Sequence, residues 1–169
     1  MKIYNIFAEH LYAFHYHGEN DNEYDRMMDL WTDIYFLREF AKANNVTDKN
    51  RFVNDILANA EEIQDFLENL SKNNEPYGYY FEPLKVSEFN KILSLQKGKI
   101  RMNRLRYYAI KLNTNCFVIT GGAIKMSQKM QDHPDTANEL VKLNKAKAFL
   151  EKNGVFDEGS FFELINEQQ

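Results

Sequence analysis

The chain has 169 residues, of which 44% are hydrophobic and 27% charged, a composition typical of a globular domain and not of a disordered one. Its single cysteine, Cys116, excludes an intramolecular disulfide and any metal site built on paired cysteines. No apolar run approaches the roughly 20 residues that a membrane-spanning helix needs. The N-terminus also lacks the apolar core of a signal peptide, so we expect a cytoplasmic protein with no membrane partner.

The net charge of −4 conceals an uneven distribution along the chain. Residues 1–90 carry a net charge of −9 and residues 134–169 carry −3. Residues 91–133 carry nine Lys and Arg against one acidic residue, Asp132, a net charge of +8. Because a local excess of positive charge attracts anionic partners whatever the mean pI, function is sought first in residues 91–133.

The first half of the chain predicts one strand and two helices. Aromatic residues alternate with smaller residues towards the end of 2–17, which is the period of a half-buried strand. Apolar residues then recur at helical spacing over 22–44 and 49–72. Two long helices joined by a short loop form an antiparallel hairpin, so we expect a helical hairpin at 22–72.

The second half predicts a sheet followed by helices. Strand-like runs lie at 79–84, 91–96, 104–112 and 116–124. The Asn-rich segment 113–115 suits a hairpin turn between the last two strands. Helical spacing returns over 135–153, and again over 158–167.

The expected fold is therefore a single α+β domain covering residues 1–169. It has an antiparallel sheet made by the N-terminal strand and residues 79–125. The helical hairpin at 22–72 packs on one face of this sheet, and residues 135–167 supply the C-terminal helices.

Two glycines interrupt the apolar strand 116–124. Gly121 and Gly122 lack the Gly-Lys-Ser/Thr sequence of a phosphate-binding P-loop. Glycine inside a strand usually marks a bulge or a bend. We therefore expect a β-bulge or a bend at the end of the strand, either of which could turn Lys125 towards the site.

Three histidines near the N-terminus raise the question of a metal site. His15 and His17 share one face of the predicted strand, whereas His10 has the opposite parity. No Asp, Glu or Cys completes a ligand set at a recognisable spacing, so we expect no metal and no other cofactor.

Basic and aromatic residues are mixed in the positively charged segment. The candidate RNA contacts are Lys97, Lys99, Arg101, Arg104, Lys111 and His133. Lys and Arg neutralise phosphates and aromatic rings stack on unpaired bases, so the combination favours single-stranded or locally opened RNA. Arg104 and Arg106 could also clamp one phosphate between them. Two other interpretations stay open: lysines that protect an exposed sheet edge, and a basic strip that pairs with the protein's own acidic helices.

Three stretches of this segment carry a resemblance to a known family. They are Arg104-Leu-Arg-Tyr-Tyr-Ala-Ile-Lys-Leu, Cys116-Phe-Val-Ile-Thr-Gly-Gly-Ala-Ile-Lys-Met-Ser-Gln-Lys, and Asp132-His-Pro before a Lys-rich helix. Together with the order strand, helix, helix, sheet, they resemble the RelE/HigB superfamily of bacterial toxins, more closely its phage Gp49-like branch. The chain departs from the family pattern at Ala123, where an aromatic residue is usual, and at Met126, where a second lysine is usual.

The resemblance implies a RelE-like fold and the toxin component of a type II toxin–antitoxin-like system. Such a toxin is an mRNA endoribonuclease that acts on the ribosome and is neutralised by a cognate antitoxin protein. The family's functional basic positions correspond to Arg106, Lys125 and Lys129. The partners implied are mRNA or the ribosome, and the antitoxin.

The chemistry of RNA cleavage without a metal assigns possible roles to these residues. It needs a base for the 2′-hydroxyl, cations for the developing phosphorane charge and an acid for the leaving oxygen. A lysine crowded by other cations loses its proton more readily, which makes Lys125 or Lys129 the candidate base. Tyr108, on the same strand face as Arg106, or His133 could assist proton transfer. The alternatives are a non-catalytic interaction protein that retains the RelE-like fold, and a structural protein derived from a phage or mobile element.

Overall fold

The computed structural model describes residues 1–72, 75–88, 90–126 and 132–168. The strands are β1 (Lys2–Asn5), β2 (Leu11–His15), β3 (Glu82–Pro83), β4 (Ser94–Gly98), β5 (Leu105–Asn113) and β6 (Cys116–Ile124). The α-helices are α1 (Glu23–Trp31), α2 (Ile34–Ala43), α3 (Lys49–Glu68), α4 (Pro134–Lys152) and α5 (Glu158–Glu167). Short 3₁₀ turns lie at Asn69–Ser71, Tyr77–Tyr79 and Val86–Glu88. The α+β class expected from the sequence is confirmed.

The six strands form one sheet in the order β1-β2-β6-β5-β4-β3. Every neighbouring pair is antiparallel except β2 and β6, which are parallel. The sheet is therefore mixed, and the expectation of a wholly antiparallel sheet is wrong in this detail. A parallel neighbour needs a long crossover connection, and the chain between β2 and β6, which includes α1, α2 and α3, provides one.

Two of the expected elements are divided. The strand expected at 2–17 is the antiparallel pair β1–β2, with His10 in the left-handed region (φ 61°) of the turn. The helix expected at 22–44 breaks between α1 and α2, because Thr32 ends α1 and the Asp33 side chain accepts a hydrogen bond of 3.1 Å from Phe36 N to cap α2. The apolar spacing continues through this break, so periodicity alone does not reveal it.

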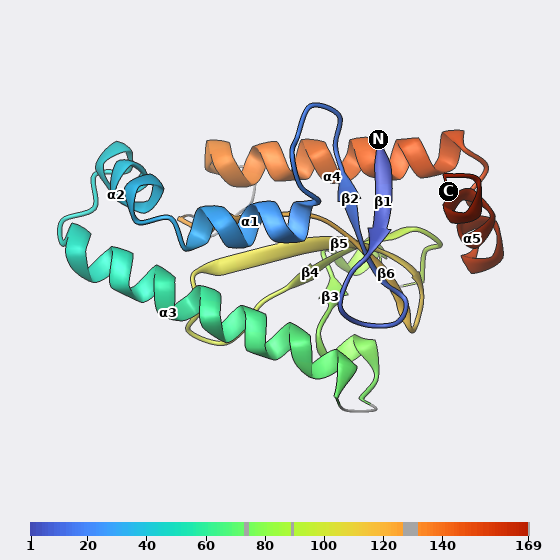
Figure 1. The fold of residues 1–169 in the computed structure, drawn as a ribbon, viewed down its shortest axis with the longest axis horizontal. Helices are drawn as coiled ribbons and strands as arrows, with labels where there is room; N and C mark the ends of the chain where they lie inside the picture. Colours follow the sequence, from blue (N-terminus) through green and yellow to red (C-terminus); the bar gives the residue numbers. More distant parts are fainter. Residues whose placement is uncertain (73–74, 89, 127–131, 169) are drawn as a thin grey trace.

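Helices cover both faces of the sheet, as Figure 1 shows, with α3 and α4 on opposite sides. Along β5, Leu105, Tyr107 and Ala109 are buried in the cluster formed with α1, α2 and α3. Tyr108 and Ile110 point the other way, into the cluster formed with α4 and α5. The strict alternation of β5 therefore decides which residues lie on the α4 face of the sheet.

The boundaries of β5, β6, α4 and α5 follow the sequence closely. The strands expected at 79–84 and 91–96 are wrong in their bounds, because only Glu82–Pro83 and Ser94–Gly98 pair in the sheet. β5 and β6 lie within one residue of the predicted 104–112 and 116–124. A capping box between Asp157 and Ser160 starts α5. Within the described ranges no helix is long and apolar enough to cross a membrane.

Candidate functional site

The two parallel strands of the sheet, β2 and β6, separate halfway along β6. β2 pairs with β6 only from Leu11 to Ala13, opposite Phe117 to Ile119. In the β5–β6 ladder Tyr108 pairs with Gly121 and Ala109 with Ile119, so Thr120 is an extra residue. Of the two predicted alternatives, a β-bulge or a bend at the strand end, the structure has the β-bulge. Beyond it, no strand of the described residues pairs with the second half of β6 on the β2 side, and we call this part of the strand the free edge of β6.

Four cations gather on the α4 face of the sheet, beside the free edge of β6. Lys97 of β4 pairs with Tyr108, and Arg106 of β5 pairs with Ala123, so these side chains share one face. Lys99 follows two residues after Lys97 and has the same parity. Lys125 follows β6, where its N–H donates to Arg104 O at 2.8 Å. We call Lys97, Lys99, Arg106 and Lys125 the basic cluster.

The members of the basic cluster affect one another's ionisation. The pKa of Lys125 is lowered, first by burial of its ammonium group and then by the positive charges of Arg106, Lys97 and Lys99. Arg106 is half-buried, and burial lowers its pKa as well. The charged forms of these side chains are therefore disfavoured in the free protein, and an anionic ligand would stabilise them.

Arg106 and Tyr108 lie next to each other on β5, at the buried side of the cluster. Arg106 Nη1 donates to the backbone oxygens of Asn103 at 2.6 Å and Leu105 at 2.8 Å. Tyr108 is 2% exposed, and burial raises the pKa of its hydroxyl to about 12. The sequence prediction that these two side chains share a face is confirmed.

One acidic residue, Glu82, lies beside two lysines of the basic cluster. Glu82 of β3 pairs with Lys97 across the sheet, and its carboxylate lies 3.9 Å from Lys97 Nζ and 3.8 Å from Lys99 Nζ. This partly supports the interpretation in which the protein's own acids neutralise the basic strip, although Glu82 belongs to a strand and not to an acidic helix. No ion pair links Arg106 or Lys125 to a carboxylate of the described residues.

Several predicted RNA contacts lie away from the basic cluster. The Arg104 guanidinium lies over the ring of Phe52 in α3, 5.3 Å from its centroid, and so is not paired with Arg106 as a clamp. Lys111 is five residues from Arg106 along β5, on the opposite face and about 17 Å away at the usual strand rise. Arg101 is exposed in the turn before β5.

The remaining two predicted residues have different outcomes. His133 is the N-cap of α4, where Nδ1 accepts from Asp135 N at 3.2 Å and Nε2 lies 2.6 Å from Asn44 Oδ1. It therefore joins the start of α4 to the end of α2 and has a structural role. Lys129 lies outside the described residues.

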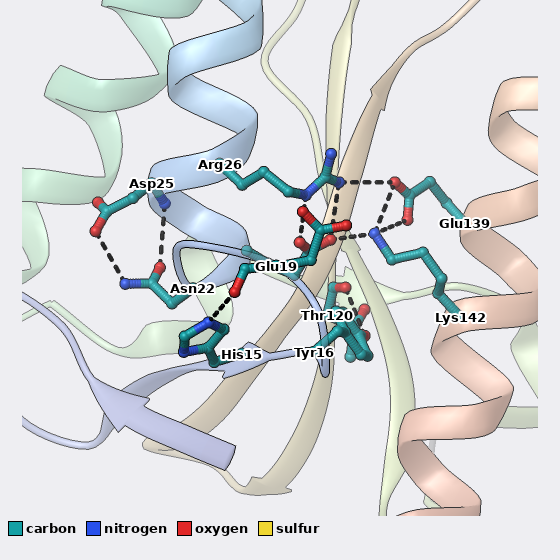
Figure 2. Close-up of polar contacts among 10 residues, drawn as sticks. His15, Tyr16, Glu19, Asn22, Asp25, Arg26, Thr120, Glu139 and Lys142 are labelled. Carbon is teal, nitrogen blue, oxygen red and sulfur yellow. Dashed lines mark hydrogen bonds and ion pairs between the residues drawn. The ribbon is translucent and has the colours of Figure 1, made fainter. Parts of the chain in front are cut away.

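A network of buried charges lies on the other side of β6 and was not predicted from the sequence (Figure 2). Glu23 of α1 is fully buried. Its carboxylate forms ion pairs with Arg26 of the same helix and with Lys142 of α4. Arg26 Nη2 also donates a hydrogen bond of 2.9 Å to Glu23 Oε1. Lys142 Nζ also donates to Glu139 Oε1 at 3.3 Å. These ion pairs connect α1 to α4. Burial raises the pKa of Glu139, and the charge of Lys142 opposes this shift.

The network borders a cavity of about 530 Å³. Its walls come from α1, α2, α4, the segment after β2 and residues 122–124 of β6. Ligand sites in sheets often lie where two parallel strands separate at their carboxyl ends, and this cavity lies where β2 and β6 do so. Ala123 contributes to its wall and pairs with Arg106, so the cavity adjoins the basic cluster.

The sequence does hold a signal for the buried network. The buried residues of α4 recur at helical spacing as Thr136, Glu139, Leu143, Ala146 and Leu150. Glu139 is therefore a charged residue within an otherwise apolar or small stripe, which indicates a partner on a neighbouring element. Glu23 carried no such signal, because an acidic residue in the first turn of a helix is common on electrostatic grounds alone.

No group of three or more His, Cys, Asp or Glu that could hold a metal ion occurs in the part of the chain that the structure describes. His10, whose role was uncertain, lies 3.8 Å from a Glu158 oxygen and packs against Phe162. No protein-family model, curated protein or solved structure matches this chain.

Proposed function

We propose that this protein binds single-stranded RNA on the basic cluster and cleaves it without a metal ion, as the toxin component of a type II toxin–antitoxin-like system. The observation that supports the proposal is the convergence of Lys97, Lys99, Arg106 and Lys125 on one face of the sheet. These four side chains come from β4 and the residue after it, from β5, and from the residue that follows β6. Phosphate groups provide the negative charge that such a surface lacks.

In this proposal the four cations have three roles. Lys125 acts as the base for the 2′-hydroxyl, because its lowered pKa increases the fraction that is unprotonated near neutral pH. Arg106 stabilises the charge that develops on the scissile phosphate as the 2′-oxygen bonds to phosphorus and the bond to the 5′-oxygen breaks. The leaving 5′-oxygen takes its proton from solvent water. Lys97 and Lys99 bind flanking phosphates. Tyr108 keeps its proton at neutral pH, with a pKa of about 12, and serves as a hydrogen-bond donor beside Arg106 and not as a base.

Binding is tested with a labelled single-stranded RNA over a series of salt concentrations. We expect the logarithm of the affinity to fall with the logarithm of the salt concentration, with a slope of about −0.7 for each phosphate contacted. Arg106→Ala and Lys97→Ala should each reduce the slope by about one contact. Lys111→Ala removes a lysine from the opposite face and should change little. A slope near zero, or equal losses from Lys111→Ala, would contradict the proposal.

Cleavage is tested separately, in a chelator and with 2′-deoxy substitution as the chemical control. The wild type should leave 2′,3′-cyclic phosphate ends, and RNA lacking the 2′-hydroxyl should remain intact. Lys125→Ala should retain most binding and lose most cleavage. In a bacterial host, induction should arrest growth, and Lys125→Ala should abolish the arrest. Co-expression of a cognate antitoxin should restore growth. Absence of both cleavage and growth arrest would overturn the catalytic part.

A second candidate is a non-catalytic interaction protein with the same fold. It is favoured by the two hydrogen bonds that direct Arg106 Nη1 towards backbone oxygens of its own chain. An arginine held in this way has fewer donors for a phosphate. Salt-dependent RNA binding without any cleavage would select this candidate over the first.

A further inference from the structure

The cavity between α1 and α4 has a polar side centred on Glu139. The Glu139 side chain is 9% exposed, and no described residue donates a hydrogen bond to its Oε2, although Lys142 Nζ lies 3.1 Å away. Figure 2 shows Glu139 and Lys142 facing Arg26 across the gap between α4 and α1. The ion pair with Lys142 is the only polar contact that the described residues make with this oxygen, so a ligand amine would add a hydrogen bond that the protein does not supply.

Gly121 allows Glu139 to come this close to the sheet. A Cβ at Gly121 would lie 2.5 Å from Glu139 Oε2 and 3.0 Å from Lys142 Nζ. Any larger residue here would displace the ends of both side chains from the positions they hold beside the bulge. The carboxylate is therefore placed directly against the free edge of β6.

The free edge of β6 adds backbone groups to the same cavity. Lys125 N donates to Arg104 O, and in an antiparallel pair the direction of these groups alternates with each residue. The N–H and C=O groups of Gly122 and Ile124 are consequently directed away from β5. Both residues line the cavity. Their backbone N–H and C=O groups therefore offer hydrogen-bond donors and acceptors to a ligand, in the plane of the sheet.

Aromatic side chains also line the cavity. Trp31 of α1 and Phe36 and Phe40 of α2 contribute to its wall. A cavity that combines apolar rings with backbone hydrogen-bonding groups suits a flat heteroaromatic ligand. The volume of about 530 Å³ lies within the range of small-ligand sites.

We propose that this cavity binds an unpaired nucleobase whose exocyclic amine adjoins an acceptor ring nitrogen, which is adenine or cytosine and not guanine, whose amine adjoins a ring N–H. Glu139 accepts a hydrogen bond from the amine, the free edge of β6 meets the ring nitrogens, and the aromatic side chains contact the ring faces. The proposal rests on the proposed RNA binding, because Ala123 in the cavity wall pairs with Arg106 and places a base near the phosphates of the basic cluster. The cavity would thereby give the protein a base preference that the basic cluster alone cannot supply.

The test uses nucleosides, which have no phosphate and do not depend on the basic cluster. Trp31 is the only tryptophan in the chain and lines the cavity, so its fluorescence reports occupancy. We expect adenosine or cytidine to give a saturable change, and inosine and uridine, which lack the amine, to bind at least about tenfold more weakly. Isothermal calorimetry on the same solutions checks that the fluorescence change reports binding.

Two variants and one control complete the experiment. Glu139→Gln should reduce the preference for adenosine over inosine to less than about threefold. Ala123→Leu fills the cavity from β6 and should abolish binding even if Glu139→Gln is too unstable to measure. Asp29→Asn, an exposed change on α1, should leave binding unchanged. Equal binding of all four nucleosides, no saturable response, or a response that survives Ala123→Leu would overturn the proposal. If nucleosides bind and RNA binding is independent of salt, only the proposed function fails; if RNA binds and no nucleoside does, only the cavity proposal fails.

Discussion

The hydroxyl of Tyr16 donates a hydrogen bond of 2.7 Å to the backbone oxygen of Thr120, 104 residues later in the chain. Thr120 is the extra residue of the β6 bulge, and Tyr16 follows the end of β2. The bond therefore closes the point at which the two parallel strands separate. It also fixes one corner of the cavity next to the basic cluster.

Tyr16→Phe should destabilise the protein without changing its fold. The substitution keeps the ring, against which Lys142 Nζ lies 5.1 Å from the centroid, and leaves the buried Thr120 oxygen without its donor. We expect a loss of about 1–2 kcal/mol in the free energy of unfolding, measured by urea denaturation. Tyr35→Phe removes a hydroxyl from an exposed ring and is the control. Equal stability of the two variants would contradict the role given to Tyr16.

Glu23→Gln should have a larger effect, because Glu23 is fully buried between two cations. Without its charge, Arg26 and Lys142 lose their common anion. Removing one partner of a buried ion pair typically costs about 3 kcal/mol or more. The free energy of unfolding should fall accordingly, whereas Asp29→Asn on the exposed side of α1 should leave it within about 0.5 kcal/mol of the wild type. In a double-mutant cycle, Glu23→Gln and Lys142→Met should be strongly non-additive.

Glu82→Gln should strengthen RNA binding. Glu82 lies within 4 Å of both Lys97 and Lys99, so its charge competes with phosphate for these two lysines. We expect an increase of a few fold in affinity at low salt and a steeper salt dependence by about one phosphate contact. Glu151→Gln makes the same charge change at an exposed position on α4 and should have a smaller effect. Weaker binding by Glu82→Gln would mean that Glu82 positions the lysines and does not oppose RNA.

Gly98→Ala should disrupt the pairing of β4 with β5. Gly98 pairs with Tyr107, and a Cβ at this position would overlap the Tyr107 ring. Tyr107 is fully buried and cannot move aside without displacing its neighbours. We expect a loss of about 3 kcal/mol in the free energy of unfolding. Gly78→Ala, where a Cβ would meet no atom within 4 Å, is the matched control and should have little effect. Similar thermal midpoints for the two variants would refute this account.

The stability of the protein should fall at alkaline pH, partly because of Tyr108. Its hydroxyl has a pKa of about 12 in the folded protein, compared with an ordinary value of 10.0. Folding therefore favours the protonated form, and this contribution is complete below pH 10 and is lost as the pH rises from 10 through 12. The free energy of unfolding of the wild type should fall between pH 9 and pH 11. In Tyr108→Phe this fall should be smaller by about 1 kcal/mol, because the variant has no hydroxyl to ionise at this position. Tyr79→Phe, at an exposed ring, should lose as much as the wild type.

Much of the C-terminal half could be predicted from the sequence, because its elements depend on local patterns. The alternation in 104–112 identifies β5 and places Arg106 and Tyr108 on one face. Gly121 and Gly122 predict a bulge or a bend, since glycine within an apolar strand has few other uses. The start of α5 depends on capping groups that are adjacent in the chain.

The tertiary structure alone decided how these patterns combine. Arg104 and Arg106 are two residues apart, yet Arg104 lies against Phe52 of α3, because the helix packed beside the end of β5 offers it an aromatic ring. Lys111 has the charge of its neighbours in sequence but lies on the opposite face of the sheet. The parallel pairing of β2 with β6, the cavity where they separate and the burial of Glu23 between α1 and α4 all depend on contacts between distant segments. Local periodicity contains no information about such contacts, since it reports which face of an element is buried and not what covers it.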